Sequence, residues 1–415
     1  MKTYRHIGIY ISNTADKQRM MKDILNNILL ADIVDLSNLK GEIFSSTTID
    51  KMIDEELRHD RYLIKTAENT SLQTMSSGQQ KKALLQYQLL QQPDYIILDD
   101  VYANVDKATQ LEISQTLTSI TQKPILIQIF FRKRELLPTI YQVYTLNEAY
   151  YFQKVNDLER WKNQSHQDSQ MIQMLPNSYS DIHTDLPETL IELNNVNVQY
   201  GDKPILENIN WKIDKSEFWQ LVGPNGSGKS TLISMICGDN PKAYGQDMTL
   251  FGMKKGTGET IWDIKKHIGY FTPAMIHQFK KVDSVENMII SGLNDSVGLY
   301  IQPTDSQKNL AQNWLKMLGK SFYNKSFQQL SLGQQRMVMV VRALIKHPPL
   351  LILDEPTIGL DEVNSQLFIE LINKIVTEKK IAIIYVSHRD EPELLPEKIL
   401  ELKKANFGYT GFVKI

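Results

Sequence analysis

One nine-residue stretch in the second half of the chain has the residue types needed to bind phosphate groups. It is Gly223-Pro224-Asn225-Gly226-Ser227-Gly228-Lys229-Ser230-Thr231, and it fits the pattern G-x-x-x-x-G-K-[ST]. Glycines let the backbone point its N–H groups at phosphate oxygens, and the positive end of a following helix adds to that potential. We expect Lys229 to reach the β- and γ-phosphates of a nucleotide and Ser230 to ligate Mg²⁺. The alternative is a plain glycine-rich turn, but a predicted strand before the stretch (218–222) and a predicted helix after it (232–236) favour phosphate binding.

Two acids after an apolar run could complete this chemistry. Residues 350–353 predict a buried strand, and Asp354 and Glu355 follow it directly. We expect Asp354 to hold the magnesium shell and Glu355 to polarise an attacking water. His388 follows another apolar run, 381–386. Its position after the acids favours a γ-phosphate sensor over a surface or core histidine. The combination predicts phosphoryl transfer to water.

The two halves of the chain repeat one pattern. Each has a Ser-x-Gly-Gln-Gln segment, an acid 23 residues after the serine and a further aspartate seven residues beyond that acid. The residues are Ser76, Asp99 and Asp106 in the first half, and Ser331, Asp354 and Asp361 in the second. Matched elements at matched spacings predict a tandem duplication of a whole domain.

These residues together resemble the ATP-binding cassette (ABC) ATPase family, over most of 191–414. The resemblance implies ATP and Mg²⁺ as ligands, a D-loop at Gly359-Leu360-Asp361, with Asp106 as its counterpart in the first half, and adenine stacking on Tyr200. For Tyr200 a strand-end tyrosine is the competing interpretation. It also implies two signature motifs, at Ser331, Gly333 and Gln334 and at Ser76, Gly78 and Gln79. For the first-half motif the alternative is a serine turn that caps a helix.

One departure from the family pattern concerns a glutamine. ABC ATPases usually have it directly after the strand that 268–271 represents, but Thr272 and Pro273 stand there. Gln278 is either its substitute or a surface glutamine, and the departure puts conventional transporter coupling in doubt. Together with the stretch Ser291–Tyr300, it resembles a tandem-cassette group labelled as molybdenum-transport ATP-binding or photorepair proteins.

The first half looks degenerate. Its expected phosphate loop, Ser12–Gln18, has no glycine, and Lys17 there is expected to be a surface lysine. Asp100 stands where the second half has Glu355. The loop-to-signature distance is 64 residues against 108 in the second half, so an inserted subdomain should be missing.

We therefore predict two tandem α/β ABC-type P-loop domains: a degenerate, shortened one at 1–163, a polar linker at 164–187 and a nucleotide-binding domain at 188–415. Of the 415 residues 42% are hydrophobic, the net charge is −2 and there is one cysteine. These values fit a globular protein of a reducing compartment and give no strong nucleic-acid signal. No apolar run approaches the ~20 residues of a membrane span. His267 and His277 have no metal-ligand partners at characteristic spacing. The expected location is cytoplasmic, or peripheral at the inner membrane face through a partner.

The expected activity is ATP hydrolysis. One interpretation makes the chain the ATP-binding component of a transport system, for an oxyanion such as molybdate, with integral membrane subunits as partners. The alternative is a free-standing nucleotide switch of the translation or DNA-repair type. If the two halves pair with each other, Ser76 and Gly78 face the phosphate loop. In a homodimer, in which the second halves of two copies face each other, Ser331 of one copy would face the phosphate loop of the other.

Overall fold

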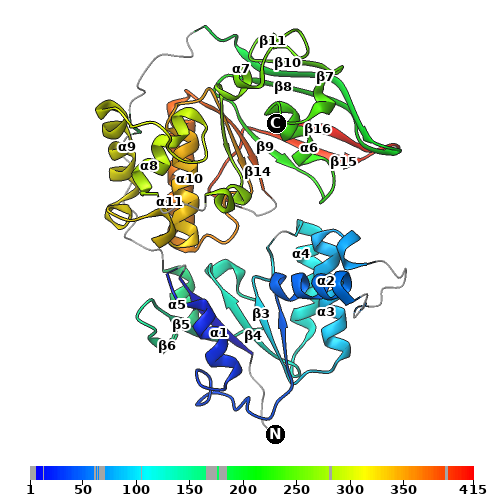
Figure 1. Cartoon of the computed structure of the whole chain (residues 1–415). Coiled ribbons are helices and arrows are strands. Elements are labelled where there is room, and N and C mark those ends of the chain that lie inside the picture. Colours follow the sequence, from blue (N-terminus) through cyan, green and yellow to red (C-terminus); the bar gives the residue numbers. More distant parts are fainter. Residues whose placement is uncertain are drawn as a thin grey trace. The chain divides into compact units, whose positions relative to one another are not determined.

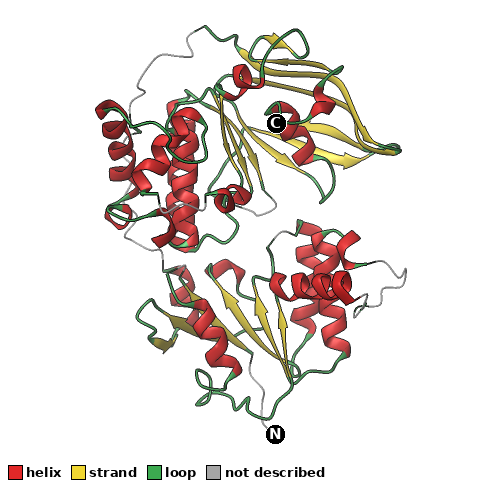
Figure 2. Ribbon diagram, in the orientation of Figure 1, coloured by secondary structure: helices red, strands yellow, loops and turns green. Residues whose placement is uncertain are grey.

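The structure is a computed structural model of the whole chain, and it describes residues 6–12, 14–59, 62, 64, 71–103, 105–164, 175–176, 185–279, 283–387 and 391–415. Most of the linker predicted at 164–187 lies outside these residues. The chain divides into two compact units: 1–167 with Gly359–Val363, and 168–358 with 364–415. Each is an α/β body (Figures 1 and 2).

The first unit is built on a six-stranded sheet in the order β2-β3-β4-β1-β5-β6. All its pairs are parallel except β5 with β6. Apolar side chains are buried on both faces of the sheet, as expected of parallel strands covered by helices. Its elements are β1 (Ile7–Ile11), α1 (Lys17–Leu25), β2 (Gly41–Phe44), α2 (Ser46–His59), η1 (Leu72–Thr74), α3 (Ser77–Leu90), β3 (Tyr95–Asp99), α4 (Lys107–Ser119), β4 (Ile125–Phe130), η2 (Lys133–Glu135), β5 (Gln142–Leu146), β6 (Phe152–Lys154) and α5 (Leu158–Asn163).

The second unit has a ten-stranded sheet in the order β11-β10-β7-β8-β16-β15-β9-β14-β13-β12. The last four strands are parallel to one another, and β9 leads directly into the phosphate loop. The strands are β7 (Thr189–Tyr200), β8 (Lys203–Asp214), β9 (Phe218–Val222), β10 (Asp247–Leu250), β11 (Met253–Lys254), β12 (Ile268–Phe271), β13 (Leu350–Asp354), β14 (Ala382–Val386), β15 (Lys398–Lys404) and β16 (Tyr409–Lys414).

Helices of the second unit cover this sheet and form a separate helical group. The group packs α8 against α9 and α10, between β12 and β13 in the chain. The helices are α6 (Lys229–Ile236), η3 (Pro241–Ala243), α7 (Ile261–Lys265), η4 (Pro273–Gln278), α8 (Val285–Ile290), η5 (Ser291–Asn294), α9 (Asp305–Leu318), η6 (Lys320–Phe322), η7 (Phe327–Gln329), α10 (Leu332–Leu344) and α11 (Glu362–Glu378). Within the described ranges no helix is both long and apolar enough to cross a membrane.

The shorter loop-to-signature distance of the first unit has a structural explanation. From β1 the chain passes through α1, β2, α2, η1 and α3 to reach β3. From β9 to β13, by contrast, it also forms β10, β11, α7 and the pair α8 and α9. The described part of the first unit therefore lacks a counterpart of the β10–β11 segment and has a reduced helical group.

Candidate functional site

The phosphate loop, Gly223–Thr231, joins the end of β9 to the start of α6, so the predicted strand–loop–helix context is confirmed. Gly226 and Gly228 have φ of 76° and 94°, which side chains rarely adopt. A Cβ at Gly228 would also lie 2.6 Å from Leu206 Cδ2. Gly228 is the N-cap of α6 and, within the described residues, no side chain caps this end. The first N–H groups of α6 therefore have no side-chain acceptor and suit an anionic ligand.

Lys229 and Asp354 place opposite charges at this loop. Lys229 is only 9% exposed, and its Nζ donates to the carbonyl oxygens of Gly223 (2.7 Å) and Pro224 (2.9 Å). Asp354 ends β13. Burial raises the pKa of its carboxyl group, and the charge of Lys229 opposes that shift. The half-buried Asp354 carboxylate, which a nearby cation would stabilise, thus lies near Lys229, whose ammonium is held by backbone carbonyls of the phosphate loop.

Glu355 is fixed by its backbone beside the same strand ends. It adopts a φ of 50°, and its N–H donates to Val386 O at 2.8 Å. Val386 pairs with Asp354 on one side and with Leu221 of β9 on the other. The carboxyl ends of β13, β14 and β9 therefore bring the two acids and the phosphate loop to one edge of the sheet. His388 lies outside the described residues.

Tyr200 is the last residue of β7, at the tip of the β7–β8 hairpin. The residue is 46% exposed, with the Lys242 ammonium 5.6 Å from the ring centre. Its hydroxyl accepts a hydrogen bond of 2.9 Å from Asn240 Nδ2. This bond could not be predicted from the sequence, because 40 residues separate the two positions.

The two predicted signature motifs have the same local geometry. Ser76 and Ser331 are the N-caps of α3 and α10, each in a capping box with the glutamine three residues on. The next glutamine also bonds back in both units: Gln80 Nε2 donates to Leu72 O (2.8 Å) and Gln335 Nε2 to Phe327 O (3.1 Å). The first unit therefore keeps the local fold of this motif. Both interpretations of Ser76 remain open, because its side chain does cap a helix.

The remnant loop of the first unit, Ser12–Gln18, is arranged against phosphate binding. Asp16 is the N-cap of α1, and its carboxylate accepts from Arg19 N, so a negative charge occupies the helix end where an anion would bind. Lys17 Nζ lies 2.5 Å from Asp99 Oδ1 and 5.4 Å from the ring centre of Phe131. The Lys17 side chain is 34% exposed, so it still reaches the surface, but it also pairs with a carboxylate that is only 15% exposed.

The D-loop candidates differ in their surroundings. Asp106 caps α4, accepting a hydrogen bond of 2.9 Å from Thr109 N. Asp361 directly precedes α11 and is 5% exposed. Their D-loop roles stay predictions.

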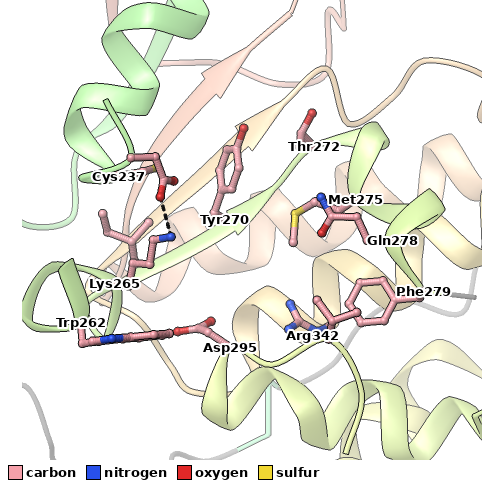
Figure 3. Close-up of a pocket in the computed structure, with 13 residues that line it drawn as sticks. Cys237, Trp262, Lys265, Tyr270, Thr272, Met275, Gln278, Phe279, Asp295 and Arg342 are labelled. Atoms are coloured by element: carbon pink, nitrogen blue, oxygen red, sulfur yellow. Dashed lines mark ion pairs between the residues drawn. The ribbon is translucent and has the colours of Figure 1, made fainter. Parts of the chain in front are cut away.

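A cavity of about 300 Å³ lies in the second unit between α7, η4 and the helical group. Figure 3 shows Thr272, Met275 and Gln278 along one side of it, opposite Trp262 and Lys265. Gln278 is the last residue of η4 and is exposed. Its candidate role as the missing glutamine also stays a prediction.

A phosphate loop between a parallel strand and a helix, an acidic pair after the second neighbouring strand and a serine-capped signature helix define a P-loop ATPase of the ABC class. The family model described as ABC transporter matches residues 206–358. The ABC transporter ATP-binding protein ModF of Escherichia coli (strain K12) is 39% identical over 329 residues, which cover 76% of this chain and 67% of ModF. The chain therefore belongs to the family of ABC transporter ATP-binding proteins, and it is an ATP-hydrolysing enzyme of that family.

Two further likenesses fit this conclusion. The zinc uptake system ATP-binding protein ZurA of Listeria innocua serovar 6a is 34% identical over 200 residues, 48% of this chain and 76% of ZurA. The solved structure of an RNase-L inhibitor covers 98% of this chain with a TM-score of 0.61, and the chain covers 85% of it. At 14% identity that likeness concerns the fold alone. The tandem α/β fold class and the family resemblance predicted from the sequence are confirmed.

Proposed function

We propose that the second unit binds ATP with Mg²⁺ in the phosphate loop and hydrolyses it, and that the energy drives a partner protein. The observation that carries the proposal is the position of Lys229. Its ammonium is held within the loop by two backbone carbonyls, and Asp354 is buried in its field. The oxygens of a bound phosphate carry negative charge, so they are stronger hydrogen-bond acceptors for this ammonium than the two carbonyl oxygens are.

The residues present fit a magnesium ion bound together with the nucleotide. Ser230 is exposed at the first turn of α6, and Asp354 ends the second strand from β9, so a hydroxyl and a carboxylate are available as oxygen ligands. Bound Mg²⁺ would neutralise charge on the β- and γ-phosphate oxygens. The raised pKa of Asp354 supports this assignment, because a cation beside a desolvated carboxylate removes the cost of its burial.

Glu355 is the proposed general base. The hydrogen bond from its backbone to Val386 O fixes where its side chain starts, at the strand edge that also leads into the phosphate loop. A carboxylate there can orient a water and accept its proton as the water attacks the γ-phosphorus. His388 is the proposed γ-phosphate sensor on sequence order alone.

We further propose that the first unit contributes its signature helix to this site. In this arrangement the Ser76 hydroxyl and the positive end of α3 would face the γ-phosphate, and Ser76 begins that helix as its N-cap. The remnant loop, with Asp16 and the pair of Lys17 and Asp99, cannot hold a second nucleotide. One hydrolytic ATP per chain follows. A homodimer in which Ser331 serves the partner's loop is the competing arrangement.

The proposed partner is an integral membrane subunit of a transport system, which would bring the chain to the inner membrane face. The names of ModF, an ABC transporter ATP-binding protein, and of ZurA, of a zinc uptake system, support transport. An oxyanion such as molybdate is the proposed cargo on the resemblance in the sequence. The cavity beside Gln278 supplies a docking place, since exposed Trp262 and the ion pair of Lys265 with Asp239 (2.6 Å) line it.

Two variants test the proposal. Lys229→Ala should abolish hydrolysis and weaken ATP binding severely, whereas unchanged turnover would remove the site assignment. Glu355→Gln should bind ATP without turnover and hold the partner-bound state. Proteins that co-purify with the Glu355→Gln variant from its host are then identified by mass spectrometry. Membrane subunits support transport; ribosomes, DNA-repair proteins or no partner support the nucleotide switch.

A further inference from the structure

The residues around Tyr200 form a connected set of hydrogen bonds that reaches the phosphate-loop helix. Asn240 Nδ2 donates to Tyr200 Oη (2.9 Å) and to Ser234 Oγ (3.0 Å). Ser234 Oγ in turn donates to Thr231 O at 2.8 Å. Thr231 is the last residue of the phosphate loop. One buried asparagine therefore links the tip of the β7–β8 hairpin to the first turn of α6.

Asn240 is itself held firmly. It is 9% exposed, its Oδ1 accepts from Lys242 N at 3.0 Å, and its own N–H donates to Ser234 O at 3.1 Å. Both side-chain atoms thus have partners, so the amide has one orientation that satisfies all of them. A donor fixed in this way can set the position of the tyrosine hydroxyl.

Tyr200, by contrast, needs such an anchor. It is the last residue of β7, followed by a turn at Gly201 with φ of 58°, and hairpin tips have few packing contacts to restrain them. Asn197 N also donates to Gln246 Oε1 at 3.0 Å. This second bond ties the same strand to the segment that follows Asn240.

We propose that Asn240 is a positioning residue for the base of ATP: it holds the Tyr200 ring at a fixed distance from the phosphate loop. The inference rests on the proposed function, in which Tyr200 stacks on adenine. A ring that is already in place loses less freedom when the base binds, so the affinity for ATP rises without any contact between Asn240 and the nucleotide.

The test uses the full chain in the Glu355→Gln background, where ATP is not consumed. The affinities for MgATP and for magnesium tripolyphosphate, which has no base, are measured by calorimetry. Asn240→Ala and Tyr200→Phe should each weaken ATP binding about 3- to 10-fold, the equivalent of one hydrogen bond. Binding of tripolyphosphate should not change. The double variant should be no weaker than either single one, because both remove the same bond.

Tyr200→Phe keeps the ring and removes only the hydroxyl, so it carries the test if Asn240→Ala does not fold. Asn210→Ala is the matched control. Asn210 is an exposed asparagine of the same hairpin whose amide bonds to Asn208 and accepts from Asn195 N, but does not contact Tyr200. Its loss should leave both affinities unchanged. In the active enzyme Asn240→Ala should raise KM with little change in kcat.

The outcomes separate the two levels of the proposal. If Tyr200→Ala leaves ATP affinity unchanged, the adenine assignment fails, and the inference fails with it. If Tyr200→Ala weakens ATP binding but Tyr200→Phe and Asn240→Ala do not, the stacking role stands and the positioning role is overturned. Equal losses for ATP and tripolyphosphate would also overturn it, since they would show a general structural effect on the phosphate loop.

Discussion

The contact between Lys17 and Asp99 in the first unit leads to a prediction about stability rather than catalysis. Replacing Lys17 by methionine keeps most of the side-chain volume but removes the ammonium that lies 2.5 Å from Asp99 Oδ1. The Asp99 carboxylate, 15% exposed, then has lost its neighbouring cation. Burial already raises its pKa, and Lys17 opposes that shift. Lys17→Met should therefore destabilise the first unit.

The magnitude follows from where the pair lies between surface and core. Exposed ion pairs contribute about 0.2–1 kcal/mol, and removing one partner of a fully buried pair costs about 3–5 kcal/mol. The Lys17 side chain is 34% exposed and that of Asp99 is 15% exposed, so the pair lies between these two cases. We therefore expect Lys17→Met to lower the free energy of unfolding by about 1–3 kcal/mol. At 1.36 kcal/mol per factor of ten, local opening should become about 5- to 150-fold more frequent.

Hydrogen exchange read by mass spectrometry is the appropriate assay, because it reports on β1 and β3 separately from the second unit. Amides of these two strands should lose protection in Lys17→Met, while those of β9 and β13 should not. Asp99→Asn should cost less, since the remaining lysine can turn to water. The double variant should resemble Asp99→Asn alone. Lys22→Met, an exposed lysine of the same helix, is the control.

Unchanged protection of β1 and β3 in Lys17→Met would show that the ion pair does not stabilise the first unit. The same would follow if the losses of Lys17→Met and Asp99→Asn simply added, because independent losses would mean that the two charges do not stabilise each other. ATP turnover should stay unchanged in the Lys17 variant under either result.

Three further predictions concern the second unit and its proposed use of the first. Gly228→Ala should abolish ATP binding in calorimetry and lower the melting temperature, since a Cβ meets Leu206 Cδ2 at 2.6 Å and φ is 94°. Ser76→Arg should stop ATP turnover, whereas Ser331→Arg should be tolerated. If Ser331→Arg is the inactive variant, and if turnover by the wild-type protein falls on dilution, the homodimer is favoured. Burial raises the pKa of Asp354 above 3.8, so the native state binds a proton more readily than the unfolded chain. Without Mg²⁺, the melting temperature should then fall as pH rises through the raised pKa, and Asp354→Asn should reduce that slope.

Local patterns predicted the elements that form the catalytic edge. The apolar run before Gly223 became β9 with the expected bounds, and the run before Asp354 became β13, which extends one residue further. Strand length and the phosphate-loop pattern are properties of contiguous residues, so both were predictable. The duplication was also visible in spacing alone. The structure extends it to a detail of hydrogen bonding, in Gln80 and Gln335.

Long-range pairings could not be predicted in this way. Lys17 and Asp99 are 82 positions apart, and Tyr200 and Asn240 are 40 apart. Each side chain has an ordinary surface interpretation until the fold brings its partner within reach. The antiparallel strands β7, β8, β10 and β11 were not distinguished from the parallel ones either, since alternating short apolar runs indicate an α/β sheet without giving the strand order.

We expect the chain to have a single ATP site, built on the phosphate loop of the second unit. Calorimetric titration of the Glu355→Gln variant with MgATP tests it most directly, because binding is then measured without turnover. We predict one ATP bound per chain, and no measurable binding at the same concentrations when Lys229→Ala is added. Two ATP molecules per chain, or one that persists after the loss of Lys229, would contradict the account.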